Sequence, residues 1–363
     1  MRVITSILFL LMMACVDPLN VKLTSEERHL VVDGLITDQP GPYQVTLSYY
    51  SNTLNPITHL QFEPVTSAQV FIVDDQQHKV KLIEKAPGIY VTLDNELTGE
   101  INKGYSLSIQ TTEGDVYQSS LQRMTHPGEI NNIYFEFYKE PRPGFTDGLQ
   151  VYIDSKGVLD ENNLFRWRWT TIHKTKTNPE FKIEYVPPRA VERPAPEPCS
   201  GYIYQGGRLV RVGECTCCFC WSYNYSEGAF VSHNDFVSDN QFNKQHLGLI
   251  PVTAMHFFDR YYIEVQQLSL SEEAYDFWNL VEKQQKGATD IFQPNAIKIR
   301  GNITSVTNPN EEVLGFFGVS AVARKSLYIN ENEVPYALPA IDLVPFSCLD
   351  YYENPTTEKP FFW

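Results

Sequence analysis

Short runs of alternating apolar and polar residues dominate the chain from residue 28 onward, and they predict β-strands. In one such run Tyr105, Leu107 and Ile109 are separated by single serines. This alternation is expected of an antiparallel sheet with one buried face. Turns containing Pro or Gly separate the runs at a spacing of about ten residues, which is typical of a β-sandwich. We therefore interpret residues 28–123 as an immunoglobulin-like β-sandwich.

The segment 123–128, RMTHPG, interrupts the strand pattern and is the best candidate for a domain boundary. A new series of strands follows it, so residues 129–363 are predicted to form a second, larger β domain. Within this domain residues 186–199 hold five prolines, and we expect them to form an extended, exposed loop.

One strand of the second domain has an unusual composition. Phe165, Trp167 and Trp169 lie on one face of it, and Arg166 and Arg168 lie on the other. Alternation alone explains this as a Trp-lined core strand with a solvated arginine face. A binding surface is the alternative, because Trp and Arg are enriched at interaction sites.

One segment of the mature chain has the pattern of a long helix, predicted at about 271–286. Ser271 is placed as its N-cap, Ser269-x-x-Glu272 has the spacing of a capping box, and Gly287 supplies a left-handed stop. Its apolar stripe, expected to pack on a sheet, comprises Ala274, Phe277, Trp278 and Val281. The side chains expected to face water include Glu272, Glu273, Asp276, Glu282 and Lys283. The fold class predicted is therefore mainly β, an N-terminal sandwich followed by a larger β domain with one amphipathic helix.

The N-terminal residues have the features of an export signal. Residues 1–14 contain a basic start and an apolar stretch that is shorter than the roughly 20 residues needed to span a bilayer. The end of the stretch, Leu11 to Cys15, is similar to a bacterial lipobox, in which the cysteine becomes the lipidated N-terminus. Residues 15–27 are polar and are predicted to form a tether. A conventional secreted protein with a coincidental cysteine is the alternative.

The cysteine count fits lipidation, because the chain has seven cysteines and removing Cys15 leaves an even number. The remaining six are Cys199, Cys215, Cys217, Cys218, Cys220 and Cys348. Disulfides persist in exported chains, so we expect these residues to be oxidised, with the connectivity open. A metal site is less favoured than disulfides, because the C-x-x-C spacings overlap, whereas a tetrahedral zinc site normally uses two separated pairs.

Charge and motifs restrict the function. A formal net charge of -15 has the wrong sign for binding phosphates, so no nucleic acid partner is expected, and any membrane attachment must be hydrophobic. His233, His246 and His256 lack the spacing of a zinc site. We predict no catalytic, metal or cofactor site from motifs. A carboxylate pair for glycosidic chemistry stays open, because only the fold brings its members together.

Several short segments, in order, resemble a family of Bacteroidota-type outer-membrane lipoproteins of unknown function (DUF4249-like). They are VVDGLIT at 31–37, FRWRW at 165–169, Cys220-Trp221, QLSLSEEAYDFW at 267–278, Gly301-Asn302-Ile303 and VLGFFGVSAV at 313–322. The resemblance implies a lipid-anchored β protein of the outer membrane, associated with a SusC-like TonB-dependent barrel. It implies no catalytic residue.

From this resemblance we expect an accessory lipoprotein that captures the substrate of a TonB-dependent transporter or completes its assembly. The expected location is the outer membrane at the cell surface, with the periplasmic face as the alternative. A surface-anchored hydrolase with unrecognised carboxylates and a structural envelope component without a ligand are the competing hypotheses.

Lipidation of Cys15 is the first testable prediction. Radiolabelled palmitate should enter the wild-type protein and not Cys15→Ala, because acylation needs the thiol. Each buried CH₂ of the lipid adds about 0.8 kcal/mol to membrane binding. Undiminished label in Cys15→Ala, or none in the wild type, contradicts the prediction.

Overall fold

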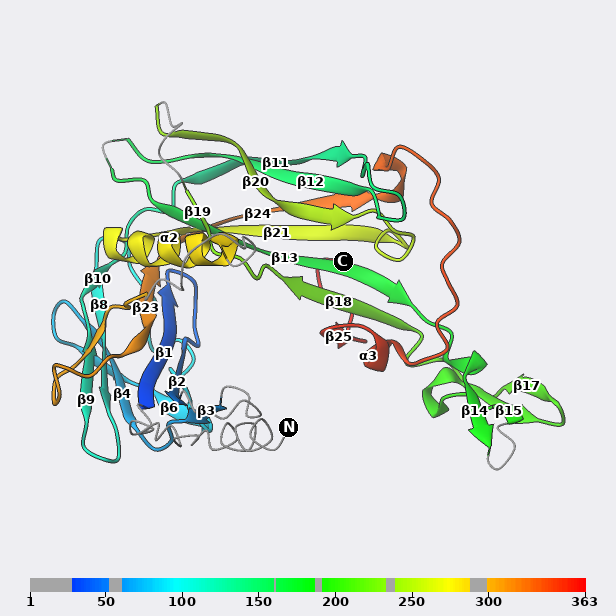
Figure 1. The fold of residues 1–363 in the computed structure, drawn as a ribbon, viewed down its shortest axis with the longest axis horizontal. Helices are drawn as coiled ribbons and strands as arrows, with labels where there is room; N and C mark the ends of the chain where they lie inside the picture. Colours follow the sequence, from blue (N-terminus) through cyan, green and yellow to red (C-terminus); the bar gives the residue numbers. More distant parts are fainter. Residues whose placement is uncertain (1–27, 52–60, 160, 187–190, 233–238, 288–298) are drawn as a thin grey trace, which may run out of the picture.

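The computed structural model describes residues 28–51, 61–159, 161–186, 191–232, 239–287 and 299–363. The predicted signal peptide, the tether and Cys15 lie outside these ranges, as does His233. The described chain is mainly β, as the sequence predicts. Two sandwiches lie side by side, and a small module projects from the far end of the second (Figure 1).

The first sandwich consists of two six-stranded sheets. One sheet runs β23 (Leu314–Ser320), β1 (Arg28–Thr37), β2 (Gln44–Ser51), β7 (Ile89–Val91), β6 (Ile83–Ala86), with β3 (Gln61–Pro64) on β2. The other runs β22 (Ile303–Ser305), β9 (Val116–Ser119), β8 (Gly104–Gln110), β4 (Gln69–Asp74), β5 (Lys79–Lys81), with β10 (Gln122–Arg123) on β8. Their inner faces share one core that includes Leu30, Val32, Leu47, Ile72, Tyr105 and Leu107.

Each sheet of this sandwich takes five strands from residues 28–123 and its sixth from residues 303–320. β23 pairs with β1 in parallel, from Val31 opposite Leu314 to Thr37 opposite Ser320. Gly315 permits this close pairing, because its φ is +89° and an added Cβ would lie 1.9 Å from the carbonyl oxygen of Val32. The sequence pattern gave no indication that these two late strands complete the first sandwich.

The second sandwich packs a three-stranded sheet on a six-stranded one. The smaller sheet runs β11 (Glu129–Tyr138), β12 (Gly148–Lys156), β20 (Gln241–Pro251). The larger runs β24 (Val322–Asn330), β21 (Arg260–Ser269), β13 (Phe165–Lys176), β18 (Phe219–Tyr225), β25 (Pro355–Thr356), with β19 (Phe230–Val231) on β13. Phe165 and Trp167 of β13 are buried between the sheets, as the alternation predicts. The arginine face of β13 is not solvated as expected, because Arg166 and Arg168 are largely buried against the first sandwich and the helix.

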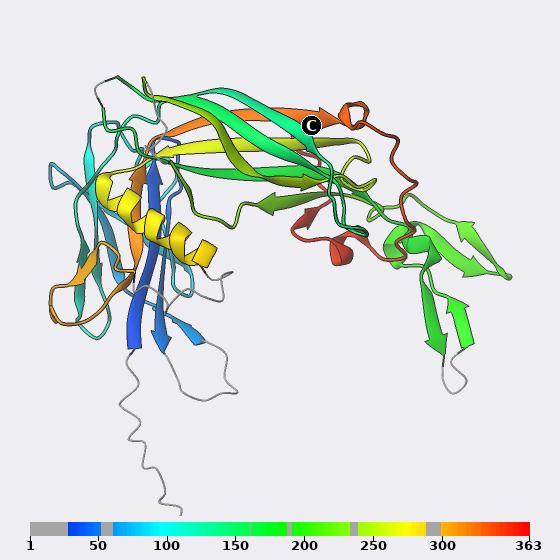
Figure 2. The ribbon, with the colours of Figure 1, turned by 45° about the horizontal axis from the view of Figure 1, so that its top comes forward.

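Helix α2 (Glu272–Gly287) lies in the corner between the two sandwiches (Figures 1 and 2). The backbone N–H of Ala274 donates to Ser271 Oγ at 3.1 Å, so Ser271 is the N-cap. The predicted stripe contacts the corner through buried Ala274 and through Phe277, whose ring lies 4.8 Å from that of Phe316 on β23. Trp278 is only partly buried, and Glu282, expected in water, is buried.

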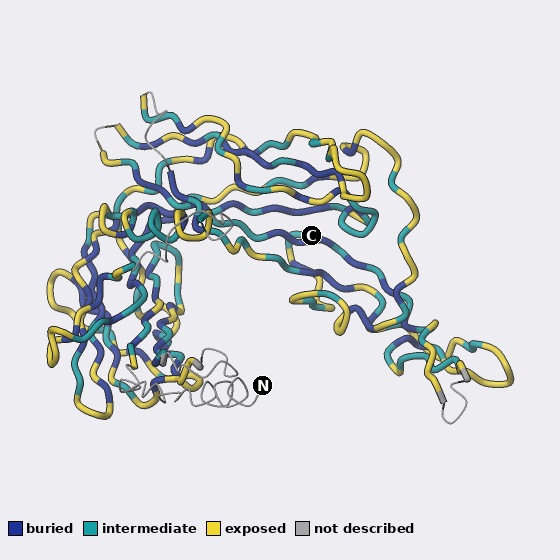
Figure 3. Tube along the Cα trace, viewed as in Figure 1, coloured by how far each residue is buried: buried dark blue, intermediate teal, exposed yellow. Residues whose placement is uncertain are grey.

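The projecting part, called here the disulfide module, comprises residues 179–218. Its elements are η1 (Pro179–Phe181), β14 (Ile183–Val186), β15 (Val191–Pro194), η2 (Pro198–Ser200), β16 (Tyr202–Gln205) and β17 (Arg208–Arg211). Its strands form two separate two-stranded ribbons. Much of its surface is exposed (Figure 3), and such small ribbons need additional support to be stable. Disulfides supply that support, as described next.

Three disulfides use all six cysteines: Cys199–Cys217, Cys215–Cys218 and Cys220–Cys348. The backbone bends at residues 216–218, and Cys215 bonds to Cys218 across this bend. The third bond links β18 to α3 (Cys348–Tyr351), which follows η4 (Glu331–Glu333) and a long C-terminal segment.

We expect the disulfide between Cys220 and Cys348 to be important for stability. Cys348→Ser should lower the free energy of unfolding by about 2–5 kcal/mol, because the bond restricts the unfolded chain. Urea unfolding of wild type and variant measures this difference. Free Cys220 and Cys348 thiols in the native protein, detected by alkylation without reductant, contradict the pairing.

Candidate functional site

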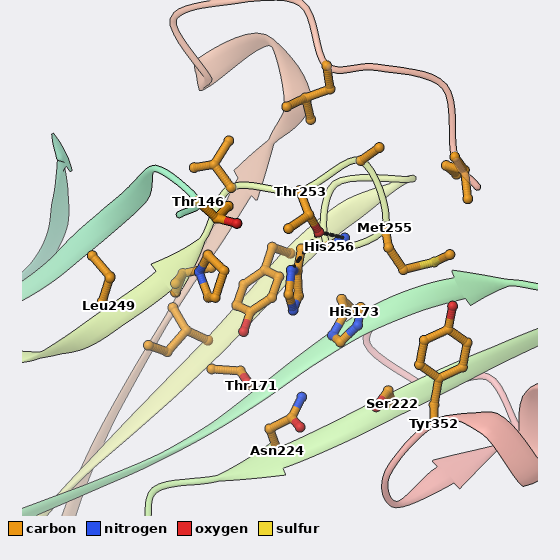
Figure 4. A pocket seen from close by; sticks show the side chains of 18 of the residues that line it. Thr146, Thr171, His173, Ser222, Asn224, Leu249, Thr253, Met255, His256 and Tyr352 are labelled. Atoms are coloured by element: carbon orange, nitrogen blue, oxygen red, sulfur yellow. Dashed lines mark hydrogen bonds between the residues drawn. The ribbon is translucent and has the colours of Figure 1, made fainter. Parts of the chain in front are cut away.

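A large cavity lies between the sheets of the second sandwich, and Pro251, Tyr261 and Ser222 are among its lining residues. Its volume is about 940 Å³. β13, β18, β20 and β21 form its walls, together with the loop 252–256. Residues 336–353, called here the cover segment, contribute the remaining side (Figure 4). A cavity of this size can bury most of a small organic ligand.

Strand register places the polar side chains of the cavity in two rows. His173 of β13 lies opposite Tyr261 of β21 on one side and Ser222 of β18 on the other. The next row of the same face brings together Ile263, Thr171 and Asn224. Successive side chains of a strand point to opposite faces, so both rows face the cavity.

His173 and His256 form an aromatic pair in the cavity (Figure 4). Their ring centroids are 4.6 Å apart, and the ring of Tyr261 stacks 5.6 Å from that of His173. Thr253 Oγ1 and His256 Nδ1 are 2.8 Å apart, which makes a hydrogen bond. His173 is 4% exposed, and its Nδ1 has no hydrogen-bond partner among the described residues. A buried polar atom without a partner is costly, so a ligand atom that bonds to it would be stabilised.

Both histidines are neutral at neutral pH. Burial, with a smaller contribution from the neighbouring His256, lowers the pKa of His173 to about 3. Burial also lowers the pKa of His256. Burial raises the pKa of Tyr261 to about 12, while a hydrogen bond with Thr171 opposes the shift. The cavity therefore offers uncharged imidazole, phenol, hydroxyl and amide groups among apolar side chains, which suits recognition of a polar but uncharged molecule.

The cover segment closes one side of the cavity through fixed contacts. Tyr336 Oη donates to Asp147 Oδ2 at 3.0 Å, and the backbone N–H of Asn178 donates to the carbonyl of Val344 at 2.7 Å. The Cys220–Cys348 disulfide fastens the end of the segment. The two carboxylates of the lining, Asp342 and Glu353, are both on this segment and both exposed.

The sequence did not indicate this site. His173 carries no motif, and it meets His256 only because β13 and β21 are neighbours. His256, which lacks the spacing of a zinc site, forms its hydrogen bond with Thr253. His246 lies elsewhere, with its ring 5.3 Å from that of Tyr152. The cysteines are held in disulfides and are not available as thiolate ligands.

Comparison with protein families places most of the chain in one of them. Residues 16–326 match the family described as "Domain of unknown function (DUF4249)". The chain belongs to the DUF4249 family. The match ends before the cover segment begins. No curated protein and no solved structure matches the chain significantly.

In the ranges that the structure describes, none of the helices combines the length and apolar character that crossing a bilayer requires.

His173 should make the protein sensitive to acid. Its folded pKa lies below the unfolded value near 6.5, so as pH falls the unfolded chain takes up the proton first. The contribution of His173 to the free energy of unfolding is complete above about pH 6.5. It should decrease by about 2 kcal/mol between pH 6.5 and 5. Urea unfolding at both pH values should show a smaller loss for His173→Phe than for wild type. The exposed His126→Phe is the control, and equal losses in all three proteins contradict the assignment.

Proposed function

We propose that this protein is an outer-membrane lipoprotein that captures a small ligand for a TonB-dependent transporter. The cavity of about 940 Å³ carries the capture part of the proposal. The cavity presents neutral donors and acceptors on the strands of a sheet. One of them, the Nδ1 of His173, has no partner among the described residues, and both features are typical of a binding site.

The proposed anchor is the lipid on Cys15, with residues 15–27 as the tether. The support is the order of features in the sequence: a short apolar signal, a lipobox-like end and a polar segment before the first strand. We place the anchored protein on the cell surface, where a capture protein meets its ligand before the barrel does. The periplasmic face of the same membrane is the alternative location.

The proposed partner, a SusC-like barrel, rests on the family resemblance. The disulfide module adds physical support, because it projects from the body and exposes apolar side chains (Figure 2). Those within or beside it are Phe181, Ile183, Tyr185, Ile203, Tyr204, Val212 and Phe219. Exposed apolar groups gathered on one part of a surface are typical of protein contacts.

The competing functions make different demands on the cavity. A glycoside hydrolase needs a carboxylic acid with a raised pKa, which usually means a buried one. Asp342 and Glu353, the carboxylates of the lining, are exposed. A purely structural component needs no cavity of this size. Ligand capture therefore accounts for the geometry better than either alternative.

A pair of tryptophan variants tests the capture step. Asn224→Trp should fill the cavity from β18, whereas Tyr225→Trp adds a similar ring on the opposite, exposed face of the same strand. Small molecules released by denaturing the natively purified proteins should be found by mass spectrometry with wild type and Tyr225→Trp and be absent with Asn224→Trp. Identical extracts from all three proteins contradict a ligand in this cavity.

Affinity purification tests the partner. The tagged protein should bring a β-barrel transporter with it from detergent-solubilised outer membrane. If no barrel is recovered under conditions that preserve a known transporter complex, the transporter role is wrong and a solitary enzyme becomes the better hypothesis.

A further inference from the structure

A second cavity, called here the junction cavity, lies where the two sandwiches and α2 meet. Its volume is about 510 Å³. Strand β1 and the loop after it line one side, and β13, β21, β24 and α2 line the others. Its lining includes three arginines, Arg166, Arg168 and Arg324, and one carboxylate, Asp33. This is a local excess of positive charge in a chain whose formal net charge is -15.

Strand register explains why the arginines gather here. Arg166 and Arg168 are two residues apart on β13 and therefore share a face. Arg168 lies opposite Gln266 of β21, and Gln266 lies opposite Arg324 of β24, so these side chains form one row across three strands. The opposite face of β13 contributes to the main core and to the main cavity.

The protein only partly satisfies these cations. Arg168 Nε donates to the neutral Gln266 Oε1 at 2.6 Å, and Arg324 Nη1 lies 3.8 Å from Glu264 Oε1. Within the described part of the chain, no carboxylate lies within ion-pair distance of Arg166. Its Nε is buried and has no acceptor among the same residues. A buried charge without a partner is costly, and leaving it unpaired needs a compensating interaction.

The charges also influence one another. Burial and the neighbouring Arg168, opposed by Asp33, together lower the pKa of Arg166 to about 10. Burial and then Arg324 lower the pKa of Arg168. Burial raises the pKa of Asp33, the carboxylate of the lining, while Arg166 opposes this shift. An added anion would offset the repulsion among the arginines, whereas Asp33 would compete with it for them.

Arg166 is held in place by the helix. Its guanidinium carbon lies 3.4 Å from the ring centroid of Trp278, which is a cation–π stack. Stacking uses a face of the guanidinium group and leaves its N–H groups, which point along its plane, able to donate.

We infer that the junction cavity binds an oxyanion, a carboxylate, sulfate or phosphate group of a small molecule. Guanidinium forks pair with the planar or tetrahedral oxygens of such groups through charge-assisted hydrogen bonds. Arg166 and Arg168 supply the buried part of the site, and Arg324, with 46% of its side chain exposed, lies where an anion can enter from solvent.

This site is separate from the proposed capture site. Among the residues that the structure describes, the lining of the main cavity holds no arginine or lysine. This cavity lies between the sheets of the second sandwich, whereas the junction cavity is lined by three arginines and lies on the other face of the larger sheet. The inference therefore stands or falls independently of the transporter role.

Thermal unfolding with sulfate and with phosphate tests the inference on the full-length, detergent-solubilised protein. Ionic strength is held constant with sodium chloride, so that general screening does not change. Specific binding raises the melting temperature along a saturable curve, from which an apparent dissociation constant follows. Sulfate and phosphate also stabilise proteins without binding, but that effect does not saturate and is shared by every variant.

Four variants distinguish the outcomes. Arg166→Gln and Arg324→Gln should each weaken binding about tenfold or more, because each removes charged hydrogen bonds to the anion. The exposed Arg142→Gln, far from the cavity in sequence, should bind like wild type. Asp33→Asn should bind more tightly, because it removes the competing carboxylate. If Arg166→Gln fails to fold, Arg324→Gln retains the test, since its side chain is half exposed.

The expected result is a saturable rise of the melting temperature in wild type and Arg142→Gln. Binding should be weaker in Arg324→Gln and tighter in Asp33→Asn. A rise that never saturates, or a saturable rise of equal midpoint in all variants, overturns the site.

Discussion

The two sandwiches are joined through the buried hydroxyl of Ser269, which is 1% exposed. Its Oγ donates to the carbonyl of Thr125 at 2.7 Å and accepts from the N–H of Ala321 at 3.0 Å. The backbone N–H of Ser269 donates in turn to the carbonyl of Ala321 at 3.0 Å. The chain passes between the sandwiches at all three of these positions, after β10, after β21 and between β23 and β24. The position of β13, and therefore of both cavities, depends on this fixed junction.

Strand β13 forms a wall of each cavity. Trp169, Thr171 and His173 face the main cavity, and Arg166 and Arg168 face the junction cavity. The two sites differ in chemistry because the two faces have different neighbours. One face meets apolar side chains of the smaller sheet, and Thr253 and His256 of the loop that follows it. The other meets the first sandwich and α2, where burial leaves cationic groups with few counter-charges. A single alternating strand thus presents uncharged side chains to one cavity and arginines to the other.

Local sequence signals predicted the strands of the first sandwich, the Trp-lined face of β13 and the cap of α2 at Ser271, because each depends on residues close together in the chain.

Features that depend on distant residues were missed. The parallel pairing of β1 with β23 brings together opposite ends of the chain, and no local pattern encodes it. Six cysteines allow 15 pairings, so spacing alone does not select one. The prediction that the arginine face of β13 is solvated was wrong for the same reason, because α2 and the first sandwich cover that face only in the folded protein. The pairing of His173 with His256 also depends on the fold alone.

The central claim is that the main cavity holds a ligand while the protein is bound to its partner. An electron-microscopy structure of the protein purified from its native outer membrane tests this most directly. We expect density for a small organic molecule in contact with His173 and His256, with a β-barrel transporter beside the disulfide module. Ordered water alone in the cavity of a protein without a barrel would contradict the claim.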